Sequence, residues 1–166
     1  MKIIVVGMDN SGKTTLCEDL ANKLKATHVK PMGPGQSKEA MLHNIQYHMA
    51  RNENTVFERF SIFEELIYGR ILRGRSKFDF QDVNLIRKYK PIIIYCRPSD
   101  EVIFNFGDRD QMSGVIEQKE KLLKAWDSFI YDALSGFKVI KYDWTKDKLG
   151  ELLPGGINNE YYSCNE

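Results

Sequence analysis

Hydrophobic residues in this chain follow two kinds of pattern, short continuous runs and longer stretches with helical spacing. The runs at residues 2–6 and 91–96 are apolar at nearly every position, which is typical of parallel strands buried on both faces. Shorter runs at 27–30, 55–57 and 137–140 predict three further strands. Helical stretches separate the runs, so the pattern predicts an α/β fold with a doubly wound, five-stranded parallel sheet.

The helical stretches begin and end at recognisable signals. Ser37 is a candidate N-cap for a helix that reaches Arg51, and Ser61 is a candidate N-cap for the next one. The predicted helical stretches are residues 16–24, 37–51, 61–71, 82–88 and 115–133. We assign residues 1–153 to one domain, which contains all of these elements. Residues 154–166 begin with Pro-Gly-Gly, and we assign them to a C-terminal tail.

Composition narrows the class of protein. The chain has 166 residues, of which 42% are hydrophobic and 28% charged, as in an ordinary globular domain with its own core. The net charge of +1 gives no electrostatic case for a nucleic-acid or membrane partner. The first apolar run ends after five residues, short of a signal peptide or a membrane span. We therefore expect a cytoplasmic protein.

Residues 7–14 read Gly-Met-Asp-Asn-Ser-Gly-Lys-Thr and fit the P-loop pattern Gly-x4-Gly-Lys-Ser/Thr. A predicted strand precedes them and a predicted helix follows, which is the context that this motif requires. Gly7 and Gly12 can adopt φ > 0 and let the backbone approach a polyphosphate. Lys13 supplies a positive charge for the β- and γ-phosphates, and the Thr14 hydroxyl suits Mg²⁺. The motif predicts a nucleoside triphosphate site made of Gly7, Asn10, Ser11, Gly12, Lys13, Thr14 and Thr15.

The predicted strand at 55–57 delivers Glu58 and Arg59 to the edge of the sheet where open α/β folds bind ligands. Other classes of P-loop protein fit less well. A GTPase usually carries Asn-Lys-x-Asp after a later strand, where this chain has Tyr-Cys-Arg-Pro at 95–98. An ATPase is expected to end a hydrophobic strand with Asp or Asp-Glu, and the run at 91–95 has no such ending.

Three segments resemble the thymidylate-kinase-like branch of the nucleoside monophosphate kinases, in particular its short phage-type members. They are the P-loop with its internal aspartate, the segment Val-Phe-Glu-Arg-Phe at 56–60, and Glu-Leu-Ile-Tyr-Gly at 65–69 with Arg-Gly at 73–74. The resemblance covers roughly residues 1–145. It implies phosphate transfer from ATP, with Mg²⁺, to a (deoxy)nucleoside 5′-monophosphate, with dTMP as the first candidate. It also suggests a role in deoxynucleotide biosynthesis, a homodimer, and a host-cell cytoplasm as the location if the gene is phage-borne.

The same resemblance implies roles for individual residues. Asp9 would accept a hydrogen bond from the deoxyribose hydroxyl of the acceptor, and Arg59 would clamp its phosphate with a planar, bidentate fork. Glu58 would orient Mg²⁺ or its water. Tyr47 and Arg51, four residues apart on one helix face, would stack on and hydrogen-bond the base, although such a pair is also common on any helix surface.

The resemblance also places Phe60 and Arg73 among the acceptor contacts. No arginine lies between the two P-loop glycines, so a further cation for the transferring phosphate must come from a lid. Arg109, in a charged stretch where the helical periodicity lapses, is the first candidate and Arg97 the second. The alternative for Arg109 is an exposed charge paired with a neighbouring aspartate.

Other functions stay open on sequence grounds. Glu-Arg at a strand end also resembles the deoxynucleoside kinases, which need a separate carboxylate near the 5′-hydroxyl, and the sequence does not place one. The arginines around residue 74 would also suit a polynucleotide 5′-end kinase. The third alternative is a non-catalytic module in which a bound nucleoside triphosphate regulates a partner.

Overall fold

The protein is built around a five-stranded, wholly parallel sheet with the strand order β2-β3-β1-β4-β5. The computed structural model describes residues 1–107 and 111–152. The strands are β1 Lys2–Val6, β2 Thr27–Val29, β3 Thr55–Glu58, β4 Ile92–Cys96 and β5 Lys138–Tyr142. The predicted fold class and all five predicted strands are confirmed. The boundary proposed near residue 153 and the tail lie outside the described residues.

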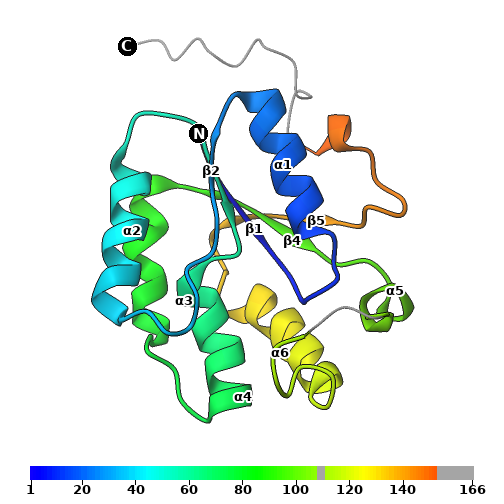
Figure 1. Ribbon diagram of the computed structural model, residues 1–166. Helices are drawn as coiled ribbons and strands as arrows, with labels where there is room; N and C mark the ends of the chain where they lie inside the picture. Colours follow the sequence, from blue (N-terminus) through cyan, green and yellow to red (C-terminus); the bar gives the residue numbers. More distant parts are fainter. Residues whose placement is uncertain (108–110, 153–166) are drawn as a thin grey trace.

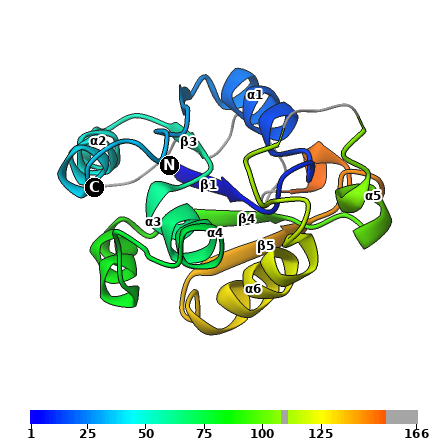
Figure 2. The ribbon, with the colours of Figure 1, turned by 60° about the horizontal axis from the view of Figure 1, so that its bottom comes forward.

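Helices cover both faces of the sheet, as Figures 1 and 2 show. One face carries α1, and the other carries α3, α4 and α6. The α-helices are α1 Lys13–Leu24, α2 Lys38–Ala50, α3 Ser61–Glu64, α4 Arg70–Arg73, α5 Asp100–Phe104 and α6 Lys119–Asp132. A π-helix, η1, spans Glu65–Gly69, and the 3₁₀-helices η2 and η3 span Phe80–Tyr89 and Leu149–Glu151. None of the helices within the described ranges is long and apolar enough to span a membrane.

The central strands are apolar on both faces because each face has its own core. In β1, Ile4 and Val6 pack into the core under α3 and α6, whereas Ile3 and Val5 pack with residues of α1. All four side chains are 0–1% exposed. This two-sided burial is the reason that the strand sequences read as continuous apolar runs rather than as alternating patterns.

Helix boundaries depart from the sequence predictions where tertiary contacts decide them. Ser37 does cap α2, since its Oγ accepts a hydrogen bond from the backbone N–H of Ala40 at 3.1 Å. Ser61 is instead the first residue of α3, and the N-cap is Phe60. The stretch predicted to be helical at 82–88 is the 3₁₀-helix η2, which begins with a capping box at Asp79. The long helix predicted from Val115 begins only at residue 119 as α6.

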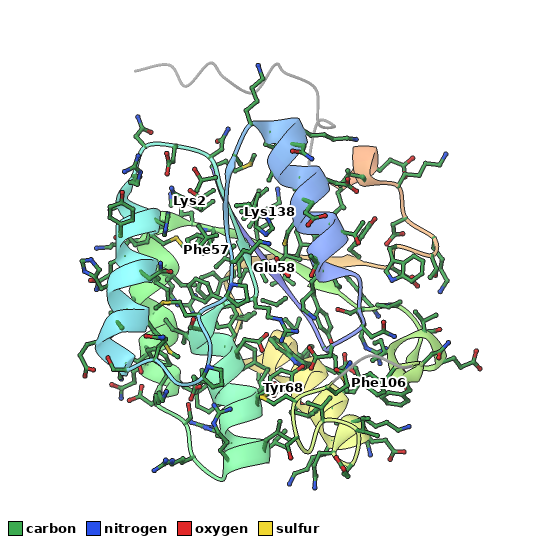
Figure 3. All side chains as sticks on the ribbon, viewed as in Figure 1. Lys2, Phe57, Glu58, Tyr68, Phe106 and Lys138 are labelled. Carbon is green, nitrogen blue, oxygen red and sulfur yellow. The ribbon has the colours of Figure 1, made fainter. Side chains whose placement is uncertain are left out.

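The direction of α2 fixes which residues reach the ligand-binding edge of the sheet. Lys2, the first residue of β1, donates from Nζ to the carbonyl of His48 at 2.7 Å and to that of Arg51 at 2.9 Å. The C-terminal end of α2 is therefore held where the strands begin. Figure 3 shows Lys2 and Lys138 at this edge, with Tyr68 and Phe106 toward the other end of the molecule. Residues near the C-terminus of α2 lie far from the strand ends.

We expect Lys2→Met to lower the free energy of unfolding by about 1–3 kcal/mol, because it removes a charged donor from carbonyls at the end of α2. Lys138→Met is the matched control, since Lys138 is also the first residue of a strand but is exposed. Urea unfolding of both variants tests the expectation. Equal stability of the two would show that the Lys2 contacts contribute nothing.

Candidate active site

The P-loop connects β1 to α1 and has the backbone that its sequence predicts. Gly7 and Gly12 have φ of 141° and 86°, and Asn10 between them has φ of 64°. A Cβ on Gly7 would lie 2.4 Å from the carbonyl oxygen of Cys96 on β4, so only glycine fits there. The N-cap of α1 is Gly12, which has no side chain to offer, so the first backbone N–H groups of α1 stay available for an anion.

Side chains of the P-loop hold the loop together. Lys13 is only 4% exposed, and its Nζ donates to the carbonyl of Met8 and, at 3.4 Å, to the hydroxyl of Ser11. Burial is the largest cause that lowers the pKa of Lys13, and the positive charge of Arg59 is the second. Asn10 donates from Nδ2 to the carbonyl of Asn105 at 2.7 Å, which ties the loop to the end of α5. The P-loop is thus a packed element of the fold.

The end of β3 meets the start of α1 at Glu58. The Glu58 carboxylate, 7% exposed as a residue, accepts a hydrogen bond from Thr14 Oγ1 at 2.5 Å, and its other oxygen lies 3.0 Å from Nε2 of His28. One hydroxyl and one carboxylate fit Mg²⁺, which takes oxygen ligands and completes its shell with water and phosphates. Within residues 1–107 and 111–152, no three His, Cys, Asp or Glu side chains gather as a metal site. Thr14 and Glu58 are the residues that fit the predicted Mg²⁺ role.

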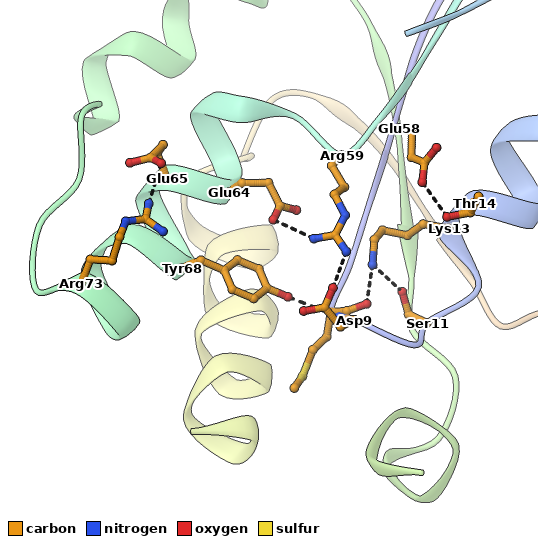
Figure 4. A network of polar contacts seen from close by, with 11 residues as sticks. Asp9, Ser11, Lys13, Thr14, Glu58, Arg59, Glu64, Glu65, Tyr68 and Arg73 are labelled. Carbon is orange, nitrogen blue, oxygen red and sulfur yellow. Dashed lines mark hydrogen bonds and ion pairs between the residues drawn. The ribbon is translucent and has the colours of Figure 1, made fainter. Parts of the chain in front are cut away.

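Arg59 lies at the centre of the site and is held by two carboxylates. Its backbone has φ of 60°, a left-handed conformation that is uncommon for a residue other than glycine and that clusters at functional sites. One terminal nitrogen pairs with the carboxylate of Asp9, and the other donates to Glu64 Oε2 at 3.3 Å (Figure 4). Burial alone would lower the pKa of Arg59, but Glu64 and Asp9 outweigh it and raise that pKa.

The two carboxylates beside Arg59 differ in their electrostatics. Burial opposes ionisation of Asp9, yet the charges of Lys13 and Arg59 outweigh it and hold the pKa of Asp9 below its usual value. Burial dominates at Glu64 and raises its pKa despite the attraction of Arg59. Glu64 Oε1 is buried and has no hydrogen-bond partner among the described residues. The pKa values of the two carboxyl groups around Arg59 are therefore displaced in opposite directions.

The π-helix η1 forms the wall of the site beyond Arg59. Its wider turn runs from Glu65 to Gly69, and π-turns inside helices are frequent at functional sites. The hydroxyl of Tyr68 accepts a hydrogen bond from the backbone N–H of Asp9 at 3.3 Å, so η1 contacts the P-loop directly. Glu65 is 4% exposed and pairs with Arg73 at 2.5 Å. The sequence offered one signal for this wall that our prediction did not use, namely the consecutive glutamates Glu64 and Glu65 among apolar residues.

These elements enclose one cavity of about 580 Å³, within the size range of small-molecule sites. The P-loop forms one end, and the segment from Arg59 through Arg73 forms the other. The loop after β2 covers a third side with Pro31, Met32 and Pro34. The predicted triphosphate-site residues from Asn10 to Thr15 and the predicted acceptor residues Asp9, Arg59 and Arg73 thus line a common space, whereas Gly7 is not among the lining residues.

Several predicted site residues lie elsewhere. Tyr47 is 51% exposed and accepts a hydrogen bond from Arg51 at 2.7 Å. Both residues lie at the edge of the sheet where the strands begin, because α2 runs back from the ligand-binding edge. The structure does not bring this pair to the cavity. Phe60 is 2% exposed and packs edge-on against Phe57 in the core. Arg109 lies outside the described residues.

Arg97, the second lid candidate, is engaged in ion pairs away from the cavity. It pairs with Asp100 at 2.7 Å and with Asp127 at 3.0 Å, and Asp127 also accepts a hydrogen bond from the Tyr95 hydroxyl at 2.7 Å. These contacts tie the end of β4 to α5 and α6. Their arrangement supports a structural role for Arg97.

Comparison with known proteins identifies the fold. No family model matches this sequence, and no curated protein sequence matches it. The YorR protein of Bacillus subtilis, solved in complex with phosphorylated GDP, matches with a TM-score of 0.70 at 17% identity, over 88% of this chain and 87% of that chain. The chain has the fold of a P-loop kinase.

Two structures of kinases also match along most of their length. A deoxyadenosine kinase from M. mycoides, with the products dCMP and dCDP, has a TM-score of 0.57 at 18% identity, over 89% of this chain and 92% of that chain. A shikimate kinase from Aquifex aeolicus has a TM-score of 0.53 at 11% identity, over 93% of each chain. A nucleoside kinase and a shikimate kinase share this fold, so the acceptor must be inferred from the site.

We expect Gly7→Ala to lower the free energy of unfolding by more than about 1 kcal/mol, because alanine is strained at positive φ and its Cβ would meet the Cys96 carbonyl. ATP binding should weaken with it, since the loop backbone must shift. Gly35→Ala is the control, since a Cβ there meets nothing within 4 Å. Urea unfolding and ATP titration calorimetry measure both effects. Matching behaviour of the two variants would contradict the conformational requirement at Gly7.

Proposed function

We propose that this protein transfers the γ-phosphate of ATP to the 5′-phosphate of a (deoxy)nucleoside monophosphate. The observation that carries the proposal is the position of Arg59, which faces the same cavity as the P-loop and is held there by Asp9. A planar guanidinium suits bidentate binding of a monophosphate. The fold alone supports only a kinase, and the acceptor class rests on this arginine.

The donor end of the cavity binds and orients the triphosphate in this proposal. Backbone N–H groups of the P-loop and the Nζ of Lys13 would hold the β- and γ-phosphates. Thr14 and Glu58 would hold Mg²⁺, which when bound supplies positive charge to the phosphate oxygens. An oxygen of the acceptor phosphate attacks the γ-phosphorus as the bond to the ADP oxygen breaks. The protein contributes mainly position and charge to this step.

The acceptor end would receive the monophosphate at Arg59 and its sugar near Asp9. The Asp9 carboxylate is ionised and already accepts from Arg59, and a carboxylate has lone pairs left for a sugar hydroxyl. Arg109 stays our candidate for the lid cation. The cytoplasmic location, the phage origin and the homodimer also stay predictions.

One observation favours a second acceptor class, a deoxynucleoside. Such a kinase needs a carboxylate that can take the proton of the 5′-hydroxyl. Glu64 borders the cavity, and its Oε1 is buried without a hydrogen-bond partner in the described part of the chain. Here Arg59, already balanced by carboxylates, would serve to position Glu64. The 5′-phosphate requirement of the acceptor separates the two classes.

A coupled ADP-release assay with ATP and Mg²⁺ tests the proposal directly. We expect a large stimulation by one or a few (deoxy)nucleoside 5′-monophosphates, because both halves of the cavity are then filled. Stimulation by nucleosides alone would establish the second class, and stimulation by 5′-hydroxyl oligonucleotides a polynucleotide-end kinase. Tight ATP binding with no stimulation by any acceptor would refute a kinase function and favour a regulatory module.

We expect Arg59→Ala to raise the acceptor KM by about 10- to 150-fold, the equivalent of a charged hydrogen bond of about 1.5–3 kcal/mol, with a much smaller change for ATP. Arg51→Ala is the matched control, since the structure places Arg51 at the opposite edge of the sheet. Steady-state kinetics with each substrate varied in turn measure both constants. Equal losses for ATP and acceptor would remove Arg59 from the acceptor site.

A further inference from the structure

The ion pair between Glu65, which is buried, and Arg73, which is partly exposed, lines the cavity but has no part in the proposed phosphate transfer. Figure 4 shows the charged side chains in series, from Lys13 through Asp9 and Arg59 to this pair at the far end. Arg73 donates to Glu65 Oε1 at 2.5 Å, and the backbone N–H of Lys77 donates to Oε2 at 3.3 Å. The pair therefore lies where the part of the acceptor most distant from the transferred phosphate would be.

Gly69, inside η1, leaves room for the chain that follows and for this pair. A Cβ there would lie 2.8 Å from the carbonyl oxygen of Arg75 and 3.1 Å from both the Arg73 guanidinium and Glu65 Oε2. Glu65 is the buried member of the pair, and a buried carboxylate is costly to desolvate. Its position on a cavity wall therefore favours a role in ligand recognition.

The pair still offers hydrogen bonds to a ligand. Each carboxylate oxygen accepts about two hydrogen bonds, and within the described residues Arg73 donates to one oxygen of Glu65 and the Lys77 N–H to the other. Arg73 has five N–H donors, and its side chain is 31% exposed. Acceptors and donors thus stand next to each other on one wall.

The same cavity also has apolar lining. Pro31, Met32 and Pro34 from the loop after β2, with Met41 from α2, contribute to it. A flat ring that contacts both these side chains and the ion pair would have apolar contacts on its face and polar contacts along its edge. This combination is typical of sites that bind and orient a planar heterocycle.

We propose that the Glu65–Arg73 pair reads the hydrogen-bonding edge of the acceptor base and selects bases that carry an exocyclic amino group. The proposal rests on the proposed kinase function. The amino group of cytosine, adenine or guanine donates to Glu65, and the adjacent ring nitrogen or carbonyl accepts from Arg73. Thymine and uracil have a carbonyl oxygen in place of that amino group, and the oxygen would face the carboxylate. The dTMP favoured by the sequence is then a poor acceptor.

Matched acceptors that differ in one amino group test the proposal. dCMP and dUMP differ only by an amino group or a carbonyl at one ring position, and dIMP lacks the amino group of both dAMP and dGMP. We expect kcat/KM for the amino member of the preferred pair to exceed that of its partner by about 5- to 150-fold, because one such contact discriminates by about 1–3 kcal/mol. dTMP should rank with dUMP.

Substitutions of Glu65 and Arg73 test whether this pair causes the preference for amino-bearing bases. Glu65→Gln keeps the shape of the side chain but replaces one acceptor oxygen with a donor, and we expect it to reduce the preference to less than about threefold while the KM for ATP stays unchanged. Arg73→Lys, at a partly exposed position, loses the planar fork and should act in the same direction even if Glu65→Gln folds poorly. Arg70→Gln is the control, since Arg70 is exposed and lies over the Phe80 ring at 4.5 Å.

The outcomes separate this proposal from the kinase function. Efficient use of dTMP or dUMP, equal to or above every amino-bearing acceptor, would overturn base selection by the pair and leave the kinase function standing. A preference that survives both variants would also overturn it. Failure of every monophosphate and nucleoside would refute the kinase function, and the base assignment with it.

Discussion

The ion pair between Asp9 and Arg59 joins the two halves of the site. Asp9 belongs to the P-loop, the proposed donor site, and Arg59 follows β3 at the edge where we propose that the acceptor binds. Strands β1 and β3 are neighbours in the sheet, so their carboxyl ends bring these side chains together. Arg59 has a left-handed backbone and also pairs with Glu64, so this contact connects the P-loop to the segment after β3. In the proposed reaction, one charged contact would set the spacing between donor and acceptor.

The segment after β3 turns this contact into a cavity wall. An uninterrupted α-helix would advance 100° per residue, whereas the wider π-turn of η1 changes which side chains face the P-loop. In the structure Glu64, Glu65 and Tyr68 all line the cavity, and Gly69 leaves room behind them. The anchor of this turn is Glu65, which binds both a side chain and a backbone N–H further along the chain. The wider turn and two side chains that line the cavity, Glu65 and Tyr68, thus occur in the same five-residue element.

The sequence predicted those features that depend on local pattern. Continuous apolar runs located the central strands β1 and β4 because strands buried on both faces leave no alternation to misread. The P-loop was predictable because its glycines and its flanking elements form one contiguous motif. The pairing of Tyr47 with Arg51 was also predictable, but the spacing carries no information about which end of α2 meets the ligand. The contacts of Glu64 at the end of α3 and of Glu65 on η1 were not predicted, because the partners of these carboxylates lie five or more residues away along the chain.

The charges of the cavity are balanced, and this balance limits how an acceptor phosphate can bind. Arg59 already has two carboxylate partners, although a guanidinium has five N–H donors and keeps some free for a further anion. A phosphate on Arg59 would bring negative charge next to Glu64, whose side chain is 17% exposed. Glu64 must then move away or take up a proton. Burial raises the pKa of Glu64, which is the direction that favours uptake of a proton, and a protonated Glu64 would donate to the phosphate instead of repelling it. The two acceptor classes thus make opposite demands on Glu64, since a phosphate acceptor would need its acid form and a hydroxyl acceptor its base form.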